Sequence, residues 1–185
     1  MIVLITGASH TGKTALAQRL LEKVHYPYLS VDHLKMGLIR SGHTELTPMS
    51  DDDALTAYLW PIVREMIKTA VENRQNLIVE GCYIPGEWRE RFTEDYLKDI
   101  RCLFIVMSED YLRQHFDAVR DEASVIEQRL CDDPDLERLI FCSDNFRRDC
   151  EQFGIPCLEI DGEYNIDEIQ RRAEELLGLT APKED

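Results

Sequence analysis

The chain has little positive charge for its length. It carries 21 Lys and Arg residues against 36 Asp and Glu residues, so its formal net charge at pH 7 is −15. A surface with that charge repels both the phosphate backbone of nucleic acids and the anionic inner leaflet of membranes. We therefore expect neither nucleic acid nor a membrane as a partner.

The sequence also lacks paired cysteines, a leader peptide, repeats and linkers. Its six cysteines form no C-x-x-C pair, so buried reduced thiols are the simplest interpretation. No charged leader or long apolar segment precedes the first motif, which begins at residue 7 and which cleavage of a signal peptide would destroy. We expect a cytoplasmic protein. Residues 1–185 are interpreted as one domain, and a domain of this size can bury about 70% of its unfolded surface without a disulfide or structural metal.

The most specific motif is a phosphate-binding loop at residues 7–14, Gly-Ala-Ser-His-Thr-Gly-Lys-Thr, which matches G-x-x-x-x-G-K-[ST] in full. An apolar run at residues 2–5 precedes it and a helical pattern of leucines follows it, so the strand, loop and helix that the motif requires are all present. Its two glycines allow the backbone to approach an anion, and the amides that follow can point at a phosphate. The residues expected to bind the nucleotide are Gly7, Ser9, His10, Thr11, Gly12, Lys13 and Thr14.

Two side chains of this loop carry its chemistry. Lys13 supplies a positive charge between the β- and γ-phosphates, and the Thr14 hydroxyl is the expected ligand of Mg²⁺. We expect Lys13 to be exposed when no nucleotide is bound. His10 and Thr11 fill variable positions of the motif and have no chemistry of their own. The motif predicts ATP and Mg²⁺ as cofactors in spite of the acidic composition, because the loop and the ion set the local field.

Four further apolar runs, at residues 26–31, 76–79, 102–107 and 155–160, are typical of short buried strands. Helical patterns separate them, which predicts an α/β fold with a parallel five-stranded sheet covered on both faces. Between the second and third runs an apolar stripe extends from Leu55 to Ala70, and Pro61 predicts a kink or a break between two helices. The last helix is expected to begin at the N-cap Asn165 and to end at Gly178.

Two carboxylates follow predicted strands. Ligands of open α/β sheets collect outside the carboxyl ends of the strands, and there the second run is followed by Asp32 and the third by Glu80. Either carboxylate could accept the proton of an attacking hydroxyl or hold Mg²⁺ through its waters. The alternatives are structural: Asp32 could be the N-cap of a helix at residues 33–41, and Glu80 could bond to the backbone amides of residues 81–86.

Arginines after the fourth strand are candidates for covering the phosphates, since phosphoryl transfer develops charge that a mobile arginine can stabilise. Arg113 and Arg120 are nearest to that strand, and Arg129 and Arg138 follow. The alternative is that each of them pairs with an acid on the surface of its own helix. The acidic run at residues 51–53 is interpreted as a helix start rather than as a metal site.

This set of motifs resembles the P-loop small-molecule kinases, a group that holds adenylate, shikimate and gluconate kinases, chloramphenicol phosphotransferase and the zeta toxins. Residues 29–42 are similar to the adenylate-kinase segment that opens the monophosphate site, but Met36 stands where that family uses an arginine. Residues 80–84 replace the Asp-Gly-Phe-Pro-Arg signature of that family and lack its arginine. Asp32 and the Glu-Gly pair at residue 80 look more like the members that phosphorylate a metabolite hydroxyl, in which the matching aspartate is the base. In the same group the loop at residues 161–165 packs on the nucleotide base.

The resemblance implies a three-layer P-loop NTPase fold with an acceptor region at about residues 33–72 and a helical lid within about residues 109–148. The implied function is MgATP-dependent phosphorylation of a hydroxyl on a small-molecule acceptor, by a monomer or homodimer. The catalytic residues would be Lys13, Asp32 and Arg120, with Arg113 on the nucleotide and Asp32, Arg40 and Glu80 on the substrate. Two alternatives stay open: a nucleoside monophosphate kinase, and a regulatory ATPase whose nearest match to a Walker B strand is residues 77–80.

Overall fold

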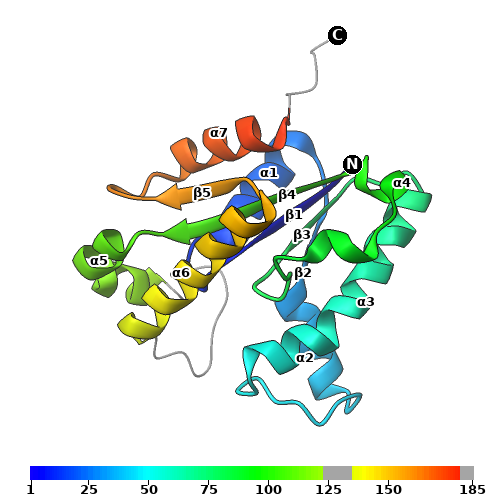
Figure 1. The fold of residues 1–185 in the computed structure, drawn as a ribbon, viewed down its shortest axis with the longest axis horizontal. Coiled ribbons are helices and arrows are strands. Elements are labelled where there is room, and N and C mark those ends of the chain that lie inside the picture. Colours follow the sequence, from blue (N-terminus) through cyan, green and yellow to red (C-terminus); the bar gives the residue numbers. More distant parts are fainter. Residues whose placement is uncertain (123–134, 180–185) are drawn as a thin grey trace.

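The computed structural model describes residues 1–122 and 135–179. Its centre is a five-stranded sheet in the order β2-β3-β1-β4-β5, in which every neighbouring pair is parallel (Figure 1). The strands are β1 (Ile2–Gly7), β2 (Tyr28–Ser30), β3 (Leu77–Glu80), β4 (Ile100–Met107) and β5 (Cys157–Ile160). All five coincide with apolar runs of the sequence, so the predicted α/β class and the parallel five-stranded sheet are confirmed.

The middle strand β1 is buried on both faces. Val3 and Ile5 lie in one core with residues of α1 (Lys13–Val24) and α7 (Ile166–Leu177). Ile2 and Leu4 lie in a second core with residues of α3 (Asp52–Glu72) and α6 (Leu136–Phe153). Side chains alternate across a strand, so an apolar run without polar gaps is what a strand covered on both sides requires. Figure 1 shows the resulting three layers of helix, sheet and helix.

The second strand is shorter than the sequence predicts. β2 ends at Ser30, and the next residue, Val31, already begins the helix α2 (Val31–Arg40). Ser30 is the N-cap of α2, and Asp32 lies inside its first turn. The alternative interpretation of Asp32 as an N-cap is therefore wrong. The boundary is set by packing: Val31 is fully buried, and a Cβ placed on Gly81 would lie 2.8 Å from the Cβ of Val31.

Pro61 does not divide the long helical segment. α3 is continuous from Asp52 to Glu72 with Pro61 inside it, so the predicted break into two helices is wrong. A proline removes the hydrogen bond to the carbonyl four residues earlier, here that of Ala57. Ala57 and Pro61 are both exposed, so water can hydrogen-bond to that carbonyl and the helix continues. At its start the helix is N-capped by Asp51, which confirms the acidic run as a helix start.

The remaining described elements are the 3₁₀ helix η1 (Trp88–Arg91), the short helix α4 (Glu94–Leu97) and α5 (Glu109–Glu122), which has a non-helical residue at His115. The last helix, α7, has Asn165 as its N-cap and Gly178 as its C-cap, as predicted. Arg129 and Cys131 lie outside the described residues, as does the C-terminal segment 180–185. The five cysteines of the described part are free thiols.

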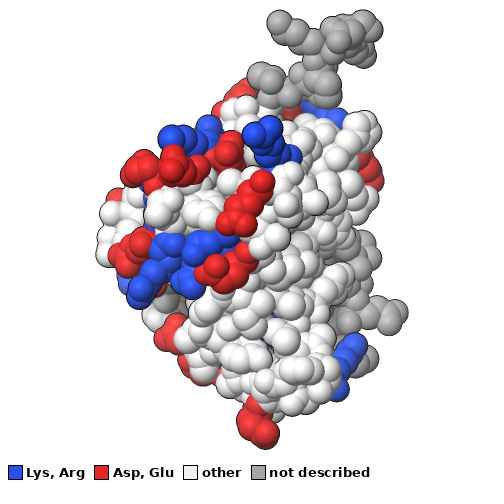
Figure 2. Space-filling model, turned by 90° about the vertical axis from the view of Figure 1, so that its right-hand side faces the viewer, with Lys and Arg blue, Asp and Glu red and all other residues white. Residues whose placement is uncertain are grey.

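Charged side chains of both signs lie together on the surface. On the face shown in Figure 2, Lys and Arg side chains lie beside Asp and Glu side chains, and a broad part of that face carries no charged residue. Within the described ranges, none of the helices is long and apolar enough to cross a membrane.

Candidate active site

The phosphate-binding loop connects β1, the central strand, to the start of α1. Its two glycines are required by both conformation and space. Gly7 has a φ of 135° and Gly12 a φ of 79°, in the region that favours glycine. A Cβ on Gly7 would collide with the carbonyl oxygen of Ile105, and a Cβ on Gly12 would collide with the hydroxyl of Tyr164. Tyr164 belongs to the loop between β5 and α7, so this loop packs directly on the phosphate-binding loop.

Lys13 is buried, with only 7% of its surface exposed, so the expectation that it is exposed is wrong. Its Nζ donates a hydrogen bond of 2.5 Å to the carbonyl oxygen of Ala8, within the same loop. The hydroxyl of Thr11 donates to that oxygen as well, at 2.9 Å. A lysine ammonium on its flexible side chain can donate a hydrogen bond to a nearby backbone carbonyl. The motif alone does not reveal this contact. The backbone of the loop therefore holds the Lys13 ammonium within the loop.

The side-chain oxygens of Thr14 and Glu80 lie together beside the loop. The Thr14 hydroxyl donates to Oε2 of Glu80 at 3.3 Å, and Glu80 is 1% exposed at the carboxyl end of β3. The two residues meet because β1 and β3 are parallel neighbours, with Ile5 opposite Glu80. A hydroxyl and a carboxylate are the hard oxygen donors that Mg²⁺ prefers. In residues 1–122 and 135–179 no group of three or more His, Cys, Asp or Glu residues lies where it could hold a metal ion.

Asp32 lies in an ion pair that the sequence did not predict. Lys35 Nζ donates to Oδ1 of Asp32 at 2.5 Å and to the Tyr83 hydroxyl at 2.8 Å. Burial disfavours the charge of Lys35, but the Asp32 carboxylate and the two hydrogen bonds outweigh burial, so the pKa of Lys35 is raised. Burial acts in the opposite direction on Tyr83, which is charged only when deprotonated, and raises its pKa. The sequence places Asp32 and Lys35 three residues apart, a spacing that allows an ion pair on one face of a helix. Nothing in the sequence indicated that Tyr83 would contact Lys35.

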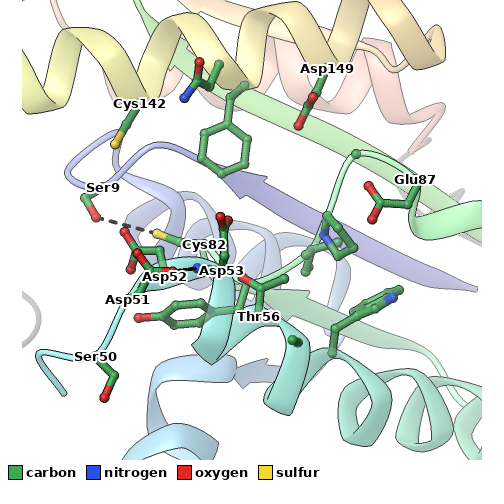
Figure 3. Close-up of a pocket in the computed structure, with 18 of the residues that line it drawn as sticks. Ser9, Ser50, Asp51, Asp52, Asp53, Thr56, Cys82, Glu87, Cys142 and Asp149 are labelled. Carbon is green, nitrogen blue, oxygen red and sulfur yellow. Dashed lines mark hydrogen bonds between the residues drawn. The ribbon is translucent and has the colours of Figure 1, made fainter. Parts of the chain in front are cut away.

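A large open cleft of about 1500 Å³ lies beside these groups (Figure 3). Its walls are one side of α3 from Asp52 to Arg64 with the residues just before it, the segment from Cys82 to Arg91, and one side of α6. Ser9 of the phosphate-binding loop lines it too, with its hydroxyl 3.7 Å from the sulfur of Cys82. Asp32 and Glu80 are not among the lining residues, but Tyr83, the partner of Lys35, is.

The predicted lid arginines lie in ion pairs on the surface. Arg113 pairs with Glu109 and Glu137, and Arg120 pairs with Asp117 and Asp121. Both arginines are more than two-fifths exposed, with side-chain values of 45% and 43%. Their proposed contact with the phosphates remains a prediction.

Arg138 lines the cleft, whereas Arg40 does not. Arg138 of α6 donates to Asp52 of α3 at 3.2 Å, and both side chains line the cleft. This ion pair joins the two helical walls of the cleft. Arg40, expected on the substrate, is exposed at the end of α2 and does not line the cleft.

No protein-family model matches the chain, and a search of curated proteins finds no match. Solved structures do match over nearly the full length. A gluconokinase from Sinorhizobium meliloti 1021 aligns over 95% of this chain and 90% of its own, with a TM-score of 0.56 and 16% identity. A shikimate kinase from Bacteroides thetaiotaomicron aligns over 97% and 99%, with a TM-score of 0.54 and 15% identity. A tunicamycin resistance protein from Deinococcus radiodurans aligns over 98% of both chains, with a TM-score of 0.59 and 16% identity. The chain thus has the fold of the P-loop small-molecule kinases, as the sequence predicts.

Proposed function

We propose that this protein is a MgATP-dependent phosphotransferase that acts on a hydroxyl of a small metabolite. One observation carries the proposal: a complete phosphate-binding loop, with Lys13, Thr14 and Glu80 gathered on it, opens at Ser9 into a cleft large enough for an acceptor. Small-ligand sites occupy about 300–1,000 Å³, so a cleft of about 1500 Å³ can hold an acceptor beside the terminal phosphate. The gluconokinase and shikimate kinase that share the fold support a kinase of this general kind.

The residues of the loop would divide the work on the donor side. Lys13 would leave the Ala8 carbonyl and bind the β- and γ-phosphates, while the loop amides hold the same oxygens. Thr14 and Glu80 would hold Mg²⁺. When bound, this ion neutralises phosphate charge and so favours transfer. Tyr164, packed against Gly12, would border the nucleotide from the β5–α7 loop.

On the acceptor side Asp32 is the proposed general base. The acceptor oxygen attacks the γ-phosphorus, the bond from that phosphorus to the β–γ bridging oxygen breaks, and its electron pair leaves with ADP. The hydroxyl proton passes to the Asp32 carboxylate. Lys35 holds that carboxylate in place, and Tyr83 links the pair to the cleft wall. Arg113 and Arg120 would have to leave their ion pairs to contact the substrates, and Arg40 would have to move because it does not line the cleft.

The Lys13→Ala variant tests the proposal. Calorimetry should show MgATP binding to the wild type and weakened binding to the variant, and ADP release with a panel of hydroxyl acceptors should be lost. Lys23→Ala is the matched control, because Lys23 lies at the other end of the same helix and pairs with Glu174 of α7, away from the loop. Unchanged MgATP affinity in Lys13→Ala would contradict the nucleotide site. ATP binding without ADP release for any acceptor would favour a regulatory ATPase.

A further inference from the structure

The lining of the cleft is rich in carboxylates. Six acidic residues line it against three arginines, and no lysine is among the lining residues. The acidic members are Asp51, Asp52, Asp53, Glu87, Glu90 and Asp149. The cleft is a candidate binding site because of its volume and its opening beside the phosphate-binding loop, and the charges of its lining indicate which kind of acceptor fits.

None of the three arginines of the lining forms an ion pair with Glu87 or Asp149. Arg138 is paired with Asp52, and Arg64 is paired with Glu65, which lies outside the cleft. Arg91 is exposed on η1 and forms no ion pair with a described residue of the cleft. Two of the three arginines are thus held in ion pairs, and the third is exposed.

Of the six carboxylates, Asp52 alone forms an ion pair with a described residue, Arg138. Glu87 and Asp149 are set apart from the other unpaired carboxylates because they approach one another from the two walls of the cleft. Neither forms an ion pair or accepts a hydrogen bond from another side chain within residues 1–122 and 135–179. A Cβ placed on Gly86 would lie 2.9 Å from Oδ2 of Asp149, so this carboxylate abuts the segment that carries Glu87. Burial, and then the charge of Glu87, raise the pKa of Asp149. Asp149 is half-buried and Glu87 is exposed. Two carboxylates that repel one another make a favourable place for a ligand cation.

The position of this pair relative to the phosphate-binding loop is defined. Figure 3 shows Ser9 and Cys82 at one end of the cleft and Glu87 with Asp149 at the other. A ligand that spans the cleft would therefore present different groups at its two ends: a hydroxyl beside the loop and a cation at the acidic pair.

The same walls favour an organic cation over a metal ion. Two carboxylates alone make a poor metal site, and no larger His, Cys, Asp or Glu group suited to a metal exists in the described ranges. Apolar side chains also line the cleft, among them Trp60 and Phe146. Met49 and Phe141, which also line it, are 77% and 62% exposed. Exposed apolar side chains beside a polar pocket are typical of a ligand-binding surface.

We propose that the acceptor is an amine-bearing alcohol with an apolar portion, held with its hydroxyl beside Ser9 and its ammonium between Glu87 and Asp149. That this ligand is the phosphoryl acceptor rests on the proposed function. The amine-binding site is argued from the lining of the cleft alone. A primary ammonium offers three donors, enough to bond both carboxylates at once. Apolar atoms of the acceptor lie against Trp60 and Phe146.

A matched panel of acceptors tests the proposal. Glucosamine, phenylalaninol and kanamycin are each compared with their N-acetylated forms, and gluconate and shikimate serve as anionic acceptors. Binding is measured by the shift in Tm and turnover by ADP release with MgATP. We expect one or more amines to bind and to be turned over, with N-acetylation lowering kcat/KM by about tenfold or more.

Variants then locate the amine. Glu87→Gln combined with Asp149→Asn should abolish the preference for the amine over its N-acetyl form and leave MgATP affinity unchanged. Glu151→Gln is the matched control, since Glu151 is an exposed acid on the same helix as Asp149 and does not line the cleft.

The outcomes separate the two proposals. Preference for an anionic acceptor, no effect of N-acetylation, or no Tm shift with any amine overturns the amine proposal and leaves the phosphotransferase intact. Amine binding that depends on Glu87 and Asp149, without ADP release for any acceptor, supports the amine site and contradicts the phosphotransferase.

Discussion

The side chains of Lys35 and Asp32 form an ion pair in the first turns of α2, with Nζ 2.5 Å from Oδ1. Lys35 is only 11% exposed and Asp32 27%, so the pair is partly shielded from water. Tyr83 closes the arrangement by accepting a second hydrogen bond from Nζ and by placing its ring 4.8 Å from the ammonium. The proposed base is thereby tied to the wall of the cleft.

Lys35→Met should destabilise the protein by about 1.5–3 kcal/mol, because it leaves a shielded carboxylate without its charged donor. The raised pKa of Lys35 means that this stabilisation is complete at neutral pH and is lost only as pH rises through that raised value. Urea unfolding at pH 7 measures the change. Lys98→Met, which breaks a pair with Asp95 whose side chains are 69% and 89% exposed, should cost less than about 1 kcal/mol. Equal losses in the two variants would show that the Lys35 pair contributes no more than a surface ion pair.

Asp32→Asn should lower kcat for the acceptor reaction by about 10²- to 10⁴-fold, since the amide cannot accept the hydroxyl proton. The amide oxygen can still accept from Lys35, so the fold and MgATP binding should be retained, while the loss of the charge opposite Lys35 should lower stability. The measurement is kcat beside Tm, with an acceptor found in the panel. Full activity in this variant would remove Asp32 as the base and direct attention to Asp53, a carboxylate that does line the cleft.

AMP, CMP, GMP and UMP should all be poor acceptors. The cleft carries twice as many carboxylates as arginines, and Arg138 is already paired with Asp52. A monophosphate would need an arginine clamp, and Met36 occupies the position at which the similar nucleotide kinases have one. Steady-state ADP release at micromolar monophosphate is the measurement. Rapid turnover of any of the four would favour a nucleotide kinase instead.

Gly12→Ala should lose MgATP binding, because the new Cβ would displace Tyr164 and strain a backbone with a φ of 79°. Gly178→Ala is a matched control: Gly178 has a φ of 64°, but a Cβ there would meet no atom within 4 Å. Both variants should lose about 1–2 kcal/mol of stability from the left-handed conformation, and only Gly12→Ala should lose nucleotide affinity by calorimetry. Normal affinity in Gly12→Ala would show that the loop tolerates a side chain where Tyr164 packs.

Asp149→Asn should stabilise the protein at pH 7. The raised pKa of Asp149 means that its charged form is disfavoured in the fold, so the carboxylate costs stability at neutral pH. That cost disappears as pH falls through the raised pKa, so the gain should shrink toward about pH 4. We expect a gain of at most about 1 kcal/mol at pH 7, because the site is only partly buried. Thermal unfolding at the two pH values measures it, with Glu151→Gln as the control that should show no such pH dependence.

The local patterns of the sequence determined the strands, the phosphate-binding loop and the last helix. Each depends on neighbours in the chain: the two glycines, Lys13 and Thr14 at fixed spacing, alternating burial along β1, and the N-cap Asn165. These features follow from the conformations that a short segment of chain can adopt. They can therefore be predicted without knowledge of the tertiary structure.

Boundaries and partners were decided only by the tertiary structure. Val31 joins α2 rather than β2 because it packs at Gly81, and Pro61 stays within α3 because its side of the helix faces water. Lys13 is buried because a carbonyl of its own loop curves back to meet it. Tyr83 reaches Lys35, and Asp149 of α6 approaches the segment that carries Glu87, across long stretches of chain. Contacts of this kind depend on how whole helices pack against the sheet, which the periodicity of a single segment does not encode.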